Sequence, residues 1–212
     1  MNVLAIAPHP DDESIGCGGA LRLHSARGER VVAVFLTSGE LGLKHLPREE
    51  AWRIREAEAR EAAKILALAD LIFLRRSDWF VGDDVKGAAE ALRVILERER
   101  PELIYLPHSA EWHPDHQAAL PLVRAALAGS ANPAPVLRTY EVWTPLTQYD
   151  VVENVTSVMD DKLRAIRAHK SQFGGECDYE RAATGLNQYR GALAGRCAYA
   201  EVFQTVEAAA GR

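Results

Sequence analysis

Residues 3–19 read VLAIAPHPDDESIGCGG, an apolar run that leads into a cluster of charged residues. The run ends at Pro8, a pattern typical of a strand that is buried on both faces of a parallel sheet. His9, Asp11 and Asp12 follow at its carboxyl end, where such groups are costly unless something there uses them. Zinc binds imidazole nitrogen and carboxylate oxygen. His9 and Asp12 can therefore supply two metal ligands, which leaves Asp11 beside the metal as a base.

A similar motif follows a second strand pattern. Leu103–Leu106 is apolar, and the sequence HPDH occupies residues 113–116 shortly after it. Pro114 suits the first turn of a helix, where its missing N–H is no loss. His113 and His116 are three residues apart, so both can face one site from that turn. Either motif alone would be a weak signal, but two such motifs after buried-strand patterns predict one shared metal site.

Apolar strand patterns alternate with helix patterns along the chain. We expect a turn at residues 16–19 and a helix that ends near Gly28, and then helices at 49–68, 85–98, 114–128, 161–170 and 178–192. Further strands are expected at 30–36, 70–74, 102–106, 136–142, 151–155 and 199–205. This rhythm predicts an α/β fold, a three-layer Rossmann-like and mostly parallel sheet with helices on both faces. No linker interrupts the 212 residues, so we expect a single domain over 1–212.

Composition restricts the class of protein and its partners. An apolar content of 48% and a charged content of 26% are those of an ordinary globular protein. The net charge of −5 gives no reason to expect nucleic acid or an anionic membrane as a partner. Three cysteines without metal-site spacing, and no signal-peptide or membrane-span pattern, predict a cytoplasmic protein with reduced thiols. A homo-oligomer is compatible with all of this.

Polar residues follow several of the expected strands, which predicts one pocket. Ligands of open α/β sheets bind outside the carboxyl ends of the strands. HPDDE, Asp78, HPDH and Thr144 all stand at such ends. The glycines of residues 16–19 could suggest nucleotide phosphate, but they do not fit GxGxxG and no Walker lysine follows.

Taken together, these motifs resemble the LmbE-like, or PIG-L, family of zinc-dependent N-acetylglucosaminide deacetylases. The likeness runs through most of the chain, since Arg55-x-x-Glu58 and the HKSQ of residues 169–172 belong to it as well. The resemblance implies hydrolysis of the N-acetyl group of a small N-acetylglucosamine conjugate, such as a precursor of a low-molecular-weight thiol. It also implies one zinc ion per chain, or another divalent metal, held by His9, Asp12 and His116.

The family pattern also implies roles for the neighbouring residues. Asp11 would take a proton from the attacking water as general base, and a cationic His113 would stabilise the oxyanion of the tetrahedral intermediate. Asp115 would orient or charge His113. The leaving amine would receive its proton from Asp11 or from His113. The tyrosine that some family members place two residues before HPDH is replaced here by Glu111.

Arg55 and Asp78 match family positions that hold sugar hydroxyls. Arg55 and Glu58 fall on the inward, apolar stripe of their helix, which leaves two interpretations. They form a buried ion pair of structural value, or Arg55 reaches the site while Glu58 holds it in place. Two alternatives to the main function also remain, a family member acting on another N-acyl small molecule and a non-catalytic module that binds a sugar or nucleotide.

Overall fold

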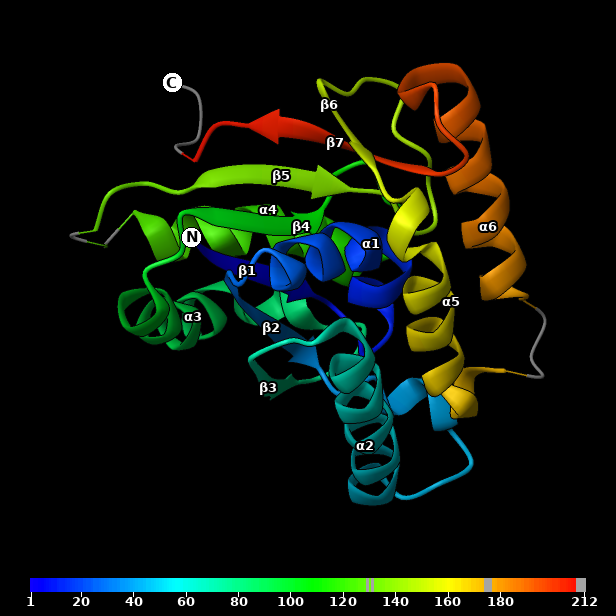
Figure 1. Cartoon of the computed structure of the whole chain (residues 1–212). Coiled ribbons are helices and arrows are strands. Elements are labelled where there is room, and N and C mark those ends of the chain that lie inside the picture. The colour runs from blue at the N-terminus through cyan, green and yellow to red at the C-terminus, as the bar shows by residue number, and fades with distance from the viewer. Residues whose placement is uncertain (129, 131, 174–176, 209–212) are drawn as a thin grey trace.

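The computed structural model describes residues 1–128, 130, 132–173 and 177–208 (Figure 1). Within these residues seven strands form one sheet in the order β3-β2-β1-β4-β5-β7-β6. The strands are β1 (Asn2–Ala7), β2 (Arg30–Thr37), β3 (Asp70–Arg76), β4 (Leu103–Pro107), β5 (Val136–Tyr140), β6 (Val151–Asn154) and β7 (Ala200–Val206). The five strands from β3 to β5 pair in parallel, whereas β7 is antiparallel to both β5 and β6. The predicted, mostly parallel α/β sheet is confirmed.

Helices cover both faces of this sheet (Figure 1). The α-helices are α1 (Asp12–Ala26), α2 (Arg48–Leu66), α3 (Val85–Glu99), α4 (Pro114–Leu127), α5 (Met159–Ala168) and α6 (Tyr179–Arg190). Short helical turns are η1 (Glu40–Leu43), η2 (Val81–Asp84), η3 (Thr156–Val158), η4 (Lys170–Gln172) and the π-helical η5 (Gly191–Gly195). None of the helices in the described ranges combines the length and the apolar character that crossing a membrane requires.

The alternation of side chains along β1 shows why its sequence is apolar throughout. Leu4 and Ile6 belong to a buried cluster with residues of α3 and α4. Val3 and Ala5 belong to another cluster with residues of α1 and α2. Successive side chains of a strand point to opposite faces, so a strand between two helix layers needs apolar residues at every position. The three-layer arrangement follows from this pattern.

The order of the strands determines where a ligand can bind. The chain winds outward from β1 to β2 and β3 on one side, and from β4 to β5 on the other. The order therefore reverses between β1 and β4, and such a switch point opens a crevice at the carboxyl ends of the strands. HPDDE follows β1 and HPDH follows β4. The fold thus brings the two motifs to one place.

The expected turn at residues 16–19 is wrong, because these residues lie inside α1. Gly16 permits close packing, since a Cβ there would lie 2.3 Å from Cδ2 of Tyr140. The helix is irregular at Cys17 (φ −137°, ψ 15°). The N–H groups of Gly19 and Ala20 donate to the carboxylate of Glu201 at 2.8 Å each. The amides that a phosphate would use are therefore bound to a carboxylate.

The boundaries of the other elements lie within about two residues of the predictions, and the end of β5 is one of the differences. That strand ends at Tyr140 and not at Val142. The N–H groups of Val142 and Trp143 donate to Glu111, at 2.8 Å and 3.1 Å, and not to a neighbouring strand. A buried carboxylate thus ends the strand and fixes the segment that follows it.

Candidate metal and catalytic site

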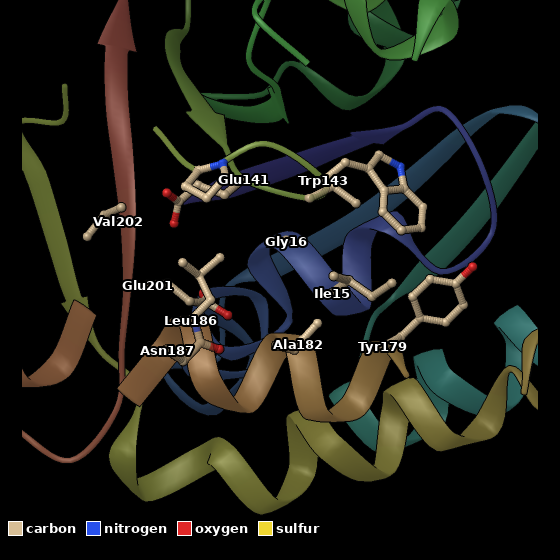
Figure 2. Close-up of a pocket in the computed structure, with 13 residues that line it drawn as sticks. Ile15, Gly16, Glu141, Trp143, Tyr179, Ala182, Leu186, Asn187, Glu201 and Val202 are labelled. Carbon is tan, nitrogen blue, oxygen red and sulfur yellow. The ribbon is translucent and has the colours of Figure 1, made fainter. Parts of the chain in front are cut away.

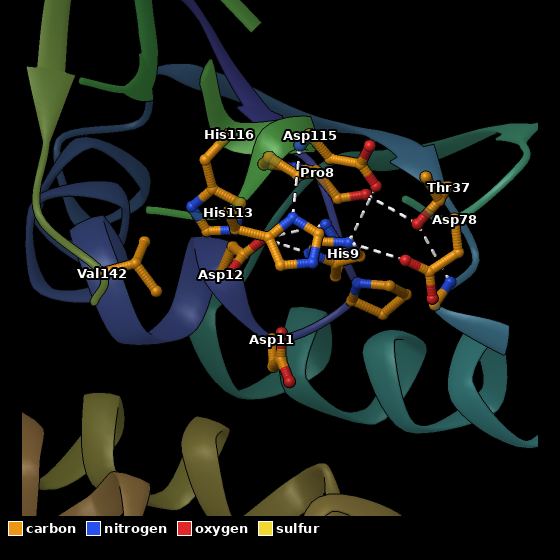
Figure 3. A network of polar contacts seen from close by, with 12 residues as sticks. Pro8, His9, Asp11, Asp12, Thr37, Asp78, His113, Asp115, His116 and Val142 are labelled. Atoms are coloured by element: carbon orange, nitrogen blue, oxygen red, sulfur yellow. Dashed lines mark hydrogen bonds and ion pairs between the residues drawn. The ribbon is translucent and has the colours of Figure 1, made fainter. Parts of the chain in front are cut away.

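His9 lies at the centre of a polar network at the switch point (Figure 3). Its Nδ1 is 3.2 Å from Oδ2 of Asp12. Its Nε2 is 3.1 Å from Oδ1 of Asp78 and 3.2 Å from Oδ2 of Asp115. Burial opposes the charged ring, but hydrogen bonds to Asp115, Asp12 and Asp78 outweigh it and raise the pKa of His9 well above its usual range. Three carboxylates therefore surround the ring of His9.

The donor groups around Asp12 fit a bound cation. Oδ2 of Asp12 is 3.2 Å from Nδ1 of His9 and 3.2 Å from Nε2 of His116. Ligands at 2.0–2.1 Å from a tetrahedral zinc are separated by about 3.3 Å. Asp12 and His116 are 1% and 0% exposed. In the described structure Oδ1 of Asp12 makes no hydrogen bond, and Nε2 of His116, although close to Oδ2 of Asp12, does not meet it at hydrogen-bonding geometry. A divalent ion would satisfy these buried atoms.

His113 is close enough to take part in a metal site as well. Ligand atoms of His9, His113 and His116 lie within 4.8 Å of one another, and so do those of His9, Asp78, His113 and Asp115. His9 binds Asp78 and Asp115 through Nε2, which leaves Nδ1 toward Asp12. A histidine ligand commonly uses one nitrogen for the metal and donates the other to a carboxylate. His9 and His116 of the predicted ligand set thus fall in one of these groups, whereas Asp12 is in neither, so the set His9, Asp12 and His116 stays a prediction.

Asp11 has an unusual backbone and a charged partner. Its φ of 143° is rare for a residue other than glycine, and such strain tends to occur at functional positions. It precedes α1, yet its side chain makes no capping hydrogen bond, so helix capping does not account for its position. Burial raises the pKa of Asp11 to about 6, although the positive charge of Arg55 opposes this. A base with a pKa near neutrality suits proton transfer.

Arg55 reaches the site, but not in the way that the sequence suggested. Its Nη2 donates to Oδ2 of Asp11 (3.0 Å) and to the carbonyl of Pro10 (2.5 Å), and its Nη1 donates to the carbonyl of Gly39 (3.0 Å). Glu58 instead accepts from the N–H and the hydroxyl of Ser171, at 2.7 Å and 2.6 Å. The predicted pairing of Arg55 with Glu58 is therefore wrong, and Arg55 holds Asp11.

Asp115 supports His9 and not His113. Besides His9, its carboxylate accepts from the N–H groups of Trp79 (2.8 Å) and Val81 (3.0 Å). The expectation that this carboxylate orients or charges His113 is thus corrected. Asp78 is similarly committed, since its second oxygen accepts from the N–H of Leu41 at 2.9 Å. Both carboxylates fix the orientation of His9 and tie down the loop after β3.

His113 precedes α4 and faces the site as a neutral ring. Its Nδ1 accepts from the N–H of Asp115 at 3.2 Å, which leaves the proton on Nε2. Burial lowers the pKa of His113 to about 4, and positive charge on His9 and His116 acts in the same direction. The structure therefore favours a neutral N–H donor over the predicted cation. Trp79 and Trp112 pack against the ring, with centroids 4.6 Å and 5.4 Å away.

Sequence reasoning missed the supporting roles of Glu13 and Glu111. Oε2 of Glu13 accepts from the N–H of Asp11 at 3.1 Å, and Oε1 lies 3.4 Å from Nε2 of the buried His169. Glu111 is buried and holds the segment after β5, with Oε2 3.9 Å from Nδ1 of His116. Both residues stand in or next to the two motifs. A carboxylate in or next to a motif could have indicated a supporting role. Its partners could not be predicted, because most of them are distant in sequence.

A family model and a curated relative match this chain. The family model "PIG-L: GlcNAc-PI de-N-acetylase" matches residues 4–127. Probable N-acetyl-alpha-D-glucosaminyl L-malate deacetylase 2 of Bacillus cereus is 32% identical over 185 residues, which cover 81% of this chain and 83% of that protein.

Solved structures extend the likeness over the whole fold. The conserved protein TT1542 from Thermus thermophilus has a TM-score of 0.85 and 32% identity, and the match covers 100% of this chain and 97% of that chain. The N,N'-diacetylchitobiose deacetylase from Pyrococcus horikoshii has a TM-score of 0.86 and 28% identity, covering 97% and 84%. The proteins from Bacillus cereus and Pyrococcus horikoshii are both named as deacetylases.

Proposed function

Since the chain belongs to the PIG-L, or LmbE-like, family, we propose that it is a metal-dependent hydrolase that removes the N-acetyl group from an N-acetylglucosamine conjugate. The observation that carries this proposal is the position of Asp11. It is a buried carboxylate with a strained backbone, held by Arg55 and directly preceding the proposed ligand Asp12 in the sequence. A module that only binds a sugar or nucleotide has no need of such a base.

His9, Asp12 and His116 would hold the ion, which we propose to be one zinc per chain. Imidazole and carboxylate ligands suit zinc, although iron, cobalt and nickel accept similar donors. When bound, such an ion lowers the pKa of water and polarises the carbonyl of the amide. Asp78 and Asp115 would keep His9 in the tautomer that binds through Nδ1.

Asp11 would take the proton from the attacking water. Arg55 directs its carboxylate and favours the ionised form, while burial keeps its pKa close to neutrality. The neutral His113 would donate its Nε2 proton in a hydrogen bond to the developing oxyanion. The amine would then leave with the proton that Asp11 has taken, because a neutral His113 is already used as a donor.

The contacts of Arg55 and Asp78 favour positioning roles over the predicted contacts with sugar hydroxyls. Each already binds protein groups around the reacting centre. The substrate would be a small N-acetylated sugar conjugate, as the names of the relatives indicate for those proteins. We further propose a cytoplasmic enzyme with a single domain over residues 1–212.

An amine-release assay tests the proposal. Methyl 2-acetamido-2-deoxyglucopyranoside and N,N'-diacetylchitobiose would be incubated with the metal-loaded protein, and primary amine and acetate would be measured together. We expect equal amounts of both products, and we expect Asp11→Asn to reduce their rate by roughly 10²–10⁴-fold. If folded, metal-loaded protein releases neither product from a panel of N-acetylglucosamine conjugates, the proposed function is wrong.

A further inference from the structure

A cavity of about 190 Å³ lies between α1, α6 and residues 141–145 (Figure 2). Its walls are largely apolar and include Ile15, Val142, Trp143, Ala183, Leu186 and Val202. A cavity of roughly 150 Å³ lined by apolar side chains can hold a benzene ring. The volume is therefore sufficient for a ring-sized group.

A row of aromatic side chains connects this cavity to the candidate site. Trp112 is 58% exposed and lies 5.4 Å from His113, measured between ring centroids. Trp143 lies 6.2 Å from Trp112, and Tyr179 lies 5.3 Å from Trp143. Trp143 and Tyr179 both line the cavity. A substrate whose amide is beside His113 can therefore extend along this row.

Asn187, in the wall of the cavity, has a buried acceptor without a hydrogen-bond partner in the described structure. Asn187 is 4% exposed, and its Nδ2 donates to the carbonyl of Ala200 at 3.0 Å. That bond determines the orientation of the side-chain amide, because Oδ1 could not donate to the carbonyl of Ala200. Oδ1 has no partner in the described structure. Leaving a buried acceptor unpaired is costly, so an occupant with an N–H or O–H donor would be favoured.

The charged groups of the cavity are already neutralised. Glu201 accepts from the buried Lys162 at 2.6 Å, and Glu141 is paired with Arg190. Among the described lining residues there is no lysine, arginine or histidine. An anionic group would meet two carboxylates and no free cation, so a neutral occupant is favoured.

We propose that this cavity binds the aglycone of the N-acetylated sugar, and that the preferred aglycone is neutral, ring-sized and apolar with one N–H or O–H donor. The inference rests on the proposed deacetylase function. A longer N-acyl chain is the other group that could extend from the amide. An alkyl chain would bring no donor to Asn187, whereas a phenolic or amino-substituted ring would.

The test compares kcat/KM for the methyl, phenyl and 4-hydroxyphenyl glycosides of N-acetylglucosamine, in both anomers. We expect the 4-hydroxyphenyl glycoside to exceed the methyl glycoside by at least about tenfold, the lower end of what an apolar contact contributes. Asn187→Leu should remove the advantage of 4-hydroxyphenyl over phenyl. Ala182→Leu, on the exposed rim of the cavity, should lower the ratio of aryl to methyl activity. Arg181→Leu, exposed and outside the lining, is the matched control and should leave that ratio unchanged.

Equal kcat/KM values for all three glycosides in the unmodified protein would overturn the inference while leaving the deacetylase function intact. A preference for N-(phenylacetyl)glucosamine over the aryl glycosides would also overturn it, because the acyl chain would then occupy the cavity. A preference for a malyl glycoside, which carries two carboxylates, would contradict the charge argument. If no glycoside releases amine, the proposed function fails, and calorimetric binding of the 4-hydroxyphenyl glycoside to the unmodified protein and to Ala182→Leu still decides the cavity's role. Equal affinities would then overturn the inference.

Discussion

Arg55→Met tests whether Arg55 serves the catalytic base. Arg55 is 3% exposed, and its guanidinium donates to Asp11 as well as to the carbonyls of Pro10 and Gly39. Removing one partner of a buried ion pair costs about 3–5 kcal/mol, because the other charge is left uncompensated. In a chain of this size each kcal/mol lowers Tm by about 2–4 °C. We expect a lower Tm together with a lower kcat and a nearly unchanged KM.

A double-mutant cycle with Asp11→Asn distinguishes three roles for Arg55: positioning of Asp11, contact with substrate, and a purely structural role. In the Asp11→Asn background no carboxylate remains to be stranded, so Arg55→Met should cost less stability and little further activity. Arg53→Met on the same helix is the control, since that side chain is 74% exposed. A higher KM with unchanged Tm and kcat would mean that Arg55 contacts substrate. A lower Tm with unchanged kinetics would mean that it is only structural, and either result would refute the role assigned here.

Four substitutions test the assignments around the metal. His116→Ala should remove most of the bound metal while circular dichroism shows a preserved fold, and full metal content would exclude it as a ligand. Asp11→Asn should retain the metal with little activity, and if Asp12→Asn retains the metal while Asp11→Asn loses it, the two carboxylates are reversed. Asp115→Asn should weaken metal affinity by roughly 10–100-fold through the loss of orientation of His9, and an unchanged affinity in a metal titration would speak against that support.

The sequence was sufficient to predict the fold and the meeting of the two motifs. Uninterrupted apolar strands required helices on both faces, and the strand order brought HPDDE and HPDH to one switch point. The turn predicted at residues 16–19 is wrong, because the glycines there serve tertiary contacts and not a turn. Gly16 packs against Tyr140, and the N–H of Gly19 donates to Glu201. Tyr140 and Glu201 are both far along the chain from these glycines. No local pattern contains that information.

Which residues belong to the site could be predicted more easily than which side chains within it contact one another. Spacing along α2 suggested that Arg55 pairs with Glu58, yet Asp11 is the partner because the guanidinium extends beyond the helix to the loop after β1. Adjacent position suggested that Asp115 serves His113, but its carboxylate points to His9. Such choices depend on rotamers and on distant loops. A sequence pattern specifies neither.

The most direct test of a metal-dependent N-deacetylase is the dependence of amine release on bound metal. The protein would be stripped with a chelator, and Zn²⁺ would be returned in steps while bound zinc and amine release from methyl 2-acetamido-2-deoxyglucopyranoside are measured on the same samples. We predict no release from stripped protein, and a rate that rises in proportion to bound zinc until one ion per chain is reached. Full amine release from protein shown to be free of metal would contradict the account.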